Sequence, residues 1–260
     1  MAAVTFSRTT IALMYHAVGD ARGPAVDPHY RVDSARFRDQ LALSIRLGGG
    51  AISTLDWLAG KRGVIYTFDD GLASDHAVAW PTLAAAAGRG DFFVNPAQVG
   101  TPGYATWTQL REMSDGGMSI QSHGLDHRHF LTELSPYHLR EELRRSKLEI
   151  EAHIGKPVTL LAPPGGRSPA KLEQTAIECG YTHVLDSRPG RIESERARTF
   201  SRLAVTAQLA LPQLEAWLLG KGTALVRLQV RYSVLDLAKR AFGDETYQSL
   251  RKRLLGTPTA

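Results

Sequence analysis

The strand-like run at residues 64–68 is the feature that most constrains the fold of this chain. It is an apolar segment with β-branched residues, and two aspartates and a glycine follow it directly. In α/β proteins, sites are built at the C-terminal ends of parallel strands. Asp69 and Asp70 are costly to place side by side, because like charges raise each other's pKa. A bound metal ion removes that cost. The run therefore predicts a buried strand that carries a metal site at its end.

Apolar runs of strand length alternate with longer helical patterns along the chain. Strands are expected at residues 10–16, 63–69, 91–95, 118–122, 158–162, 182–186 and 202–206. Helices are expected at residues 34–47, 74–87, 107–114, 136–153, 170–178 and 212–219. This alternation predicts parallel βαβ units. Seven such strands favour an α/β fold of the (β/α) barrel type, seven-stranded and incomplete, over an open sheet, and 260 residues suffice for one such domain.

Two histidines follow the expected strand at residues 118–122. His123 and His127, together with one carboxylate, form a facial ligand set for a divalent metal with open positions. The other aspartate is then free to act as a base. Taken alone, the two motifs are equally compatible with surface histidines and a solvated aspartate pair.

Residues 67–71 (TFDDG) resemble the first motif of the polysaccharide deacetylases, carbohydrate esterase family four, and residues 122–127 (SHGLDH) resemble the second. Residues 107–110 and 162–166 also stand where the family expects them, so the resemblance covers residues 10–206. It implies that Asp70, His123 and His127 bind a divalent metal, usually zinc, although cobalt, nickel or iron suit the same ligands. It also implies that Asp69 is the general base and that the backbone N–H of Gly165 helps to hold the oxyanion.

The chain departs from the family pattern at the third motif. Ala162 stands where the family has an arginine that orients the base. Arg167 and Arg188 are candidate replacements, and an ordinary surface position is the alternative for both. Asp186, at the end of another expected strand, either tunes a site histidine through its charge or caps a turn.

The family's C-terminal histidine motif, which supplies an acid, is missing after residue 183. Residues 13–16 (LMYH) instead place a histidine at the end of the first strand, which resembles the circularly permuted branch of the family. That resemblance implies that His16 protonates the leaving amine and that Met14 lines the acetyl pocket. The alternative is a histidine that merely ends a strand.

The resemblance implies a metal-dependent hydrolase that removes N-acetyl groups from an amino sugar in a polysaccharide or glycan precursor. Two alternatives remain open. One is hydrolysis of a non-sugar amide or cyclic imide on the same scaffold, and the other is a catalytically impaired glycan-binding protein. The alanine in place of the arginine favours loss of catalytic activity. The intact Asp69, Asp70, His123 and His127 argue against it.

The C-terminal part of the chain differs in character from the rest. Residues 1–220 are expected to form the catalytic domain, and residues 221–260 a basic amphipathic helical tail. Within that tail, residues 229–255 either pack on the barrel or contact an anionic membrane that carries a glycolipid substrate. The net charge of +5 comes with no nucleic-acid motif, so no nucleic-acid partner is expected. No signal peptide or membrane span is recognised, which predicts a cytoplasmic protein.

Overall fold

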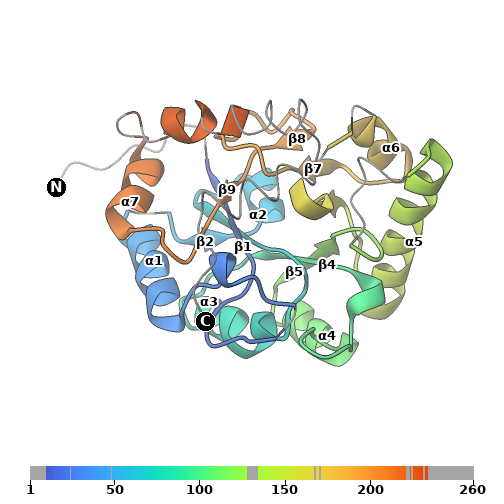
Figure 1. Ribbon diagram of the computed structural model, residues 1–260, viewed down its shortest axis with the longest axis horizontal. Coiled ribbons are helices and arrows are strands. Elements are labelled where there is room, and N and C mark those ends of the chain that lie inside the picture. The colour runs from blue at the N-terminus through green and yellow to red at the C-terminus, as the bar shows by residue number, and fades with distance from the viewer. Residues whose placement is uncertain are drawn as a thin grey trace.

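The computed structural model shows a curved parallel sheet with helices packed around its outer side (Figure 1). The structure describes residues 10–23, 25–47, 49–127, 134–166, 168–169, 171–220, 223, 225–230 and 232–233. Within that part of the chain, no helix is long and apolar enough to cross a membrane.

The sheet follows the strand order β8-β7-β6-β5-β4-β3-β1-β9, and β2 pairs with β3 off this path. All of these pairings are parallel. The strands are β1 (Ala12–Tyr15), β2 (Ala51–Ile52), β3 (Val64–Phe68), β4 (Asp91–Val94), β5 (Ser119–Ser122), β6 (Leu160–Leu161), β7 (His183–Leu185), β8 (Thr199–Phe200) and β9 (Leu203–Ala204). The incomplete (β/α) barrel is confirmed, but the path has eight strands and not seven. β2 and β8 were not predicted from the sequence, whereas the equally short β6 and β9 fall within the longer runs expected at residues 158–162 and 202–206.

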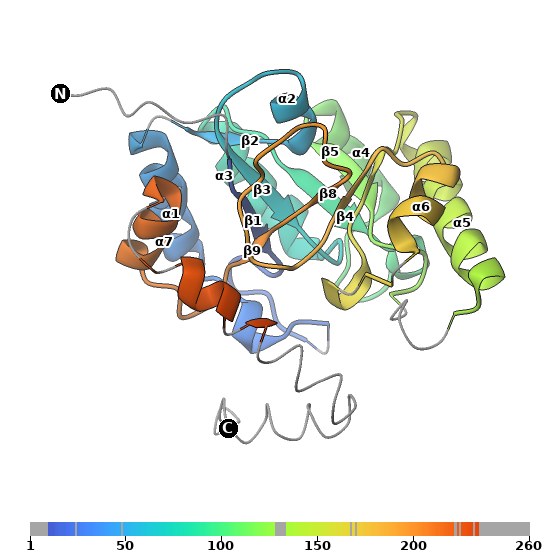
Figure 2. The same ribbon diagram turned by 90° about the horizontal axis from the view of Figure 1, so that it is seen from above.

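The two edges of the sheet are joined by one short segment. β8 pairs with β7 at one edge and β9 pairs with β1 at the other, yet only Ser201 and Arg202 separate β8 from β9. Figure 2 shows this segment crossing between the two edges. Arg202 therefore lies where the curled sheet comes closest to closing.

The helices are α1 (Ser34–Arg46), α2 (Thr54–Leu58), α3 (Trp80–Ala85), α4 (Trp107–Asp115), α5 (Pro136–Ile154), α6 (Leu172–Glu178) and α7 (Leu211–Leu219). Short 3-10 turns occur at Pro28–Tyr30, Pro96–Gln98 and Pro164–Gly166. The structure begins and ends α5 as the sequence predicts. The Ser135 side chain accepts a hydrogen bond from the His138 amide at the start, and Gly155 closes the end in the left-handed region at φ 72°.

The expected helix at residues 74–87 is interrupted. A π-helical segment, Asp75–Ala79, precedes α3, and Pro81 stands in the first turn of α3. Proline has no N–H to donate to the preceding turn, so regular α-helical bonding cannot run through this position.

Alternation along the strands separates two apolar layers. On β3, Tyr66 and Phe68 face the helices and belong to the larger core, whereas Ile65 faces the barrel interior with Phe93 of β4. The period of two places Thr67 and Asp69 on the inner side as well. A carboxylate is thereby delivered into the interior at the end of β3.

Most of the expected tail lies outside the described residues. At its start, a helical stretch at residues 225–230 packs Leu225 and Leu228 against the core, and the Gln229 side chain donates to the Pro189 carbonyl. The division at residue 220 and the membrane contact of residues 229–255 stay predictions.

Candidate metal and catalytic site

Two aspartates and two histidines converge beyond the C-terminal ends of β3 and β5. Asp69 and Asp70 follow β3, and His123 follows β5, with His127 four residues further on. Asp70 and His127 have positive φ angles of 78° and 64°, which residues with a side chain rarely adopt. Such backbone strain persists only where the surroundings enforce it, and it clusters at functional sites.

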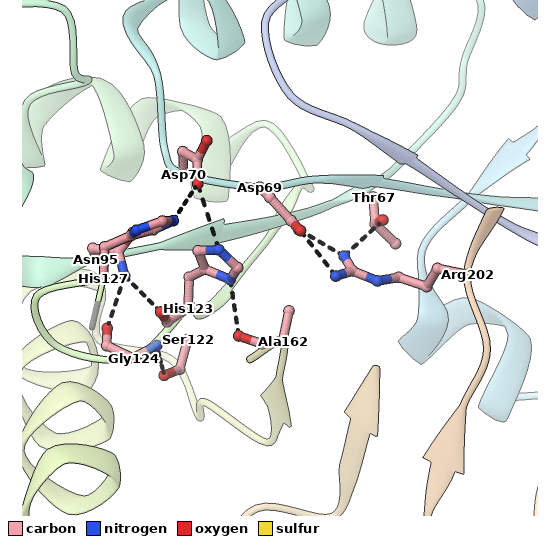
Figure 3. Close-up of polar contacts among 10 residues, drawn as sticks. All are labelled: Thr67, Asp69, Asp70, Asn95, Ser122, His123, Gly124, His127, Ala162 and Arg202. Carbon is pink, nitrogen blue, oxygen red and sulfur yellow. Dashed lines mark hydrogen bonds and ion pairs between the residues drawn. The ribbon is translucent and has the colours of Figure 1, made fainter. Parts of the chain in front are cut away.

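The ligand atoms of Asp70, His123 and His127 lie close enough to share one ion. Asp70 Oδ1 is 3.4 Å from His123 Nε2 and 3.2 Å from His127 Nε2 (Figure 3). All three ligand atoms lie within 4.8 Å of one another. Ligands about 2.1 Å from a tetrahedral zinc ion would be about 3.4 Å apart, so the cluster fits such an ion.

The orientation of His123 also fits a ligand. Its Nδ1–H donates to the Ala162 carbonyl oxygen at 2.8 Å, which leaves the Nε2 lone pair facing Asp70. Burial of Asp70 opposes its charge, but the neighbouring imidazoles of His123 and His127 hold the pKa of this carboxyl well below its usual range. The carboxylate is therefore ionised, as a metal ligand must be.

The turn between the two histidines is tied down by buried polar side chains. Asn95 donates to the carbonyl of His123. The Ser122 hydroxyl accepts from the Gly124 amide at 3.2 Å, and the Glu142 carboxylate accepts from the Leu125 amide at 2.7 Å. These contacts from β4, β5 and α5 fix the loop that carries His127.

Asp69 points away from Asp70 and is held by Arg202 (Figure 3). Arg202 Nη1 lies 2.6 Å from Asp69 Oδ1, and Nη2 lies 2.8 Å from Oδ2. Arg202 also donates to the Thr67 hydroxyl and to the Asp186 carbonyl, and neither Arg202 nor Asp69 has more than 2% of its surface exposed. Burial raises the pKa of Asp69, but the Arg202 charge and that of His123 outweigh it and hold the pKa below its usual value.

Sequence reasoning missed Arg202 as the partner of Asp69. Arg188, one of the two candidates, binds Asp186 instead, and Arg167 lies outside the described residues. A charged residue at the start of an apolar strand run was the available signal, since arginine is rarely buried without a partner. Its partner was not readable, because it lies 133 residues away in sequence.

His16 follows β1, and β1 lies between β3 and β9. The charge of His16 lowers the pKa of both Asp69 and Asp70, so the imidazole is within electrostatic reach of both carboxylates. Met14 is buried beside Thr67 and Ala204 on the neighbouring strands. A permuted barrel requires the first strand to lie beside the strand that carries Asp69 or the last strand, and β1 does so. The permutation itself stays a prediction.

The two remaining candidates lie at the ends of β6 and β7. Gly165 is exposed in the turn after β6, with φ 65°, and that turn is linked to the site through the bond between Ala162 and His123. The Asp186 side chain accepts from Arg188 and does not bind a histidine among the described residues. Burial raises the pKa of Asp186, partly offset by Arg188.

An incomplete (β/α) barrel with an Asp-His-His cluster and a separate buried aspartate at its strand ends defines a class of candidate metal hydrolases. Residues 59–184, just under half of the chain, match the family model of the polysaccharide deacetylases. YxkH of Bacillus subtilis (strain 168), whose name assigns it provisionally to the same family, is 28% identical over 137 residues. That match covers 53% of this chain and 49% of YxkH, so the chain spans about half the length of this relative.

Solved structures share the fold. The Streptococcus pyogenes deacetylase PplD, in complex with acetate, is 23% identical with a TM-score of 0.72, covering 81% of this chain and 98% of that one. IcaB from Ammonifex degensii is 24% identical with a TM-score of 0.71, covering 81% and 97%. At this identity the likeness establishes the fold.

Proposed function

We propose that this protein is a metal-dependent deacetylase that removes N-acetyl groups from an amino sugar in a polysaccharide or glycan precursor. One observation carries the proposal. The cluster of Asp70, His123 and His127 lies beside an ionised aspartate that is not part of it, in a chain with a polysaccharide deacetylase region.

The three clustered residues would hold a divalent metal, and zinc is favoured by two imidazoles and one carboxylate. When bound, such an ion lowers the pKa of a coordinated water and polarises a carbonyl oxygen. Cobalt, nickel and iron also suit this ligand set, so metal replacement is part of the test.

Asp69 would accept the proton of the water that attacks the amide carbonyl. The bidentate bond to Arg202 fixes the direction of its carboxylate and keeps it ionised at neutral pH. The backbone N–H of Gly165 would donate to the developing oxyanion. His16 would protonate the leaving amine, while Met14 would contact the methyl of the acetyl group. Arg167 and Asp186 remain proposed substrate contacts.

The buried pair of Asp69 and Arg202 argues against the impaired, glycan-binding alternative. That alternative depends on the loss of the arginine that orients the base, and Arg202 supplies such a partner from the link between β8 and β9. Hydrolysis of a non-sugar amide or cyclic imide uses the same groups and is therefore an outcome of the test.

The test is release of acetate and free amine by the zinc-loaded protein from soluble oligomers of an N-acetylated amino sugar. Asp69→Asn should retain stoichiometric zinc and lose about a hundredfold or more in turnover, because asparagine is not a base. Asp115→Asn, an exposed change on α4, serves as the control.

If the protein turned over a cyclic imide or a simple amide preferentially, the proposed sugar substrate would be wrong. Metal binding without turnover of any of the three would support a binding protein. The proposal also includes a glycolipid substrate, membrane contact through residues 229–255 and a cytoplasmic location. Sedimentation with lipid vesicles tests the membrane contact, and cell fractionation tests the location.

A further inference from the structure

The segment after β1 returns to the site and places an aromatic ring on His16. Tyr30 ends the 3-10 turn Pro28–Tyr30, and its ring stacks on the His16 imidazole. The ring centroids are 4.7 Å apart and the planes differ by 24°. His29 packs edge-on against the same tyrosine at 4.8 Å. One face of His16 is thereby covered by a side chain from outside the site motifs.

Backbone hydrogen bonds fix this segment on both sides of the ring. The Val32 amide donates to the Ala17 carbonyl at 2.9 Å, and the Gly19 amide donates to the Val32 carbonyl at 2.7 Å. The Ala207 amide, just beyond β9, donates to the His29 carbonyl at 2.9 Å. The turn that carries Tyr30 is therefore attached to the segments that follow β1, the strand that ends at His16, and β9, its neighbour.

Stacking on Tyr30 restricts the plane of the His16 ring. The Nδ1 atom of His16 is buried and has no hydrogen-bond partner within the part of the chain that the structure describes. His123 differs, because the Ala162 carbonyl fixes its plane through Nδ1. A histidine without such a bond can rotate about its side-chain torsions unless packing prevents it.

We propose that Tyr30 is a positioning residue that holds the His16 imidazole in the orientation needed to deliver a proton to the leaving amine. The inference rests on the proposed role of His16 as the acid. Proton transfer requires the donor within hydrogen-bond reach of the acceptor, so a small rotation of the ring lowers the rate of the chemical step. Substrate affinity does not depend on that rotation. Loss of the ring should therefore affect kcat and leave KM unchanged.

The test compares Tyr30→Leu with Tyr30→Phe in the zinc-loaded full chain. Leucine removes the flat ring and should lower kcat about tenfold or more while KM stays within about twofold. Phenylalanine keeps the flat ring and should restore most of the rate. Tyr137→Leu is the matched control, because Tyr137 on α5 also packs on a histidine, His138, but is 69% exposed. Zinc content should be the same in all of these variants.

A spectroscopic measurement separates this inference from the proposed function. The His16 ring-proton NMR signals, assigned by comparison with His16→Ala, should move downfield in Tyr30→Leu as the ring current is lost, and should stay near their native positions in Tyr30→Phe. If the native protein showed no turnover but the His16 signals moved as expected in Tyr30→Leu, the deacetylase proposal would be overturned. The contact between Tyr30 and His16 would still be confirmed. Unchanged His16 signals in Tyr30→Leu, an unchanged kcat, or an effect on KM alone would overturn the positioning role.

Discussion

Arg202 holds Asp69 inside the barrel, with both carboxylate oxygens bonded at 2.6 and 2.8 Å. The aspartate follows β3, whereas the arginine lies in the two-residue link between β8 and β9. Because that link joins the two edges of the sheet, near-closure of the barrel and orientation of the candidate base depend on the same segment. A cation–π contact with Phe93, at 5.4 Å, adds a third anchor inside the barrel.

Replacing Arg202 by lysine tests whether the paired geometry matters beyond charge. Lysine keeps the positive charge but offers one compact ammonium in place of two parallel donors. We expect turnover to fall about 10- to 100-fold, because the carboxylate of Asp69 is no longer held in direction. We also expect a loss of about 1–3 kcal/mol in the free energy of unfolding, from buried polar groups left unpaired.

Arg188→Lys is the matched control for this change. Arg188 also binds a buried aspartate, Asp186, but its own side chain is 61% exposed. Equal effects of the two lysine substitutions on turnover, at equal stability, would contradict a special role for the pair of Arg202 and Asp69.

The strands that carry the site were predictable from sequence. β3 is a largely apolar run that stops at Asp69. β5 is short and mostly polar, but it was expected within residues 118–122, directly before His123. The three ligand positions were readable from the resemblance of the two motifs to a known family, and they lie at the ends of β3 and β5, which β4 separates in the sheet.

The partner of Asp69 was not predictable for a physical reason. Any arginine can reach a carboxylate, and the choice between Arg167, Arg188 and Arg202 depends on how the sheet curls. The strand that contains β9 was expected at residues 202–206, but the two residues of β8 leave no period to read, so the link between β8 and β9 was not recognisable as the segment that joins the sheet edges. The stack of Tyr30 on His16 similarly depends on the path of a loop.

His123→Ala should abolish stoichiometric metal binding and leave the protein folded. His123 supplies a ligand atom, and its ring otherwise donates to the Ala162 carbonyl just after β6, at the strand ends and outside the two apolar clusters. Metal content is measured by elemental analysis after dialysis, with circular dichroism as the folding check. His76→Ala is the control, since His76 also faces a carboxylate, Glu112, at 2.8 Å, and the described residues place no third ligand there. Full zinc occupancy in His123→Ala would remove this residue from the site.

His16→Ala should lower turnover by about a hundredfold and leave metal content intact, because general acid catalysis contributes on that order. An acid must carry its proton to act, so the native rate should fall at high pH through loss of that proton. The variant should lack this fall. The measurement is kcat as a function of pH for both proteins. An identical alkaline limb in the two profiles would show that another group supplies the proton.

Asp91 predicts a pH dependence of stability that is independent of catalysis. It lies at the start of β4, fully buried, and accepts a hydrogen bond from the Thr54 amide at 2.7 Å. Burial raises its pKa from 3.8 to about 6, in spite of the bonds from Thr54. The folded protein therefore binds a proton that the unfolded chain releases between about pH 4 and pH 6, and stability falls as the pH rises through this window.

Asp91→Asn keeps an oxygen for the Thr54 amide and removes the ionisation. The variant should match the native free energy of unfolding near pH 4 and exceed it by up to about 3 kcal/mol above pH 7. Urea unfolding at several pH values measures the difference, and Asp39→Asn, an exposed change on α1, should show none. A difference that stays constant from pH 4 to pH 8 would mean that Asp91 carries no buried charge penalty, because only an ionising group makes the gap depend on pH.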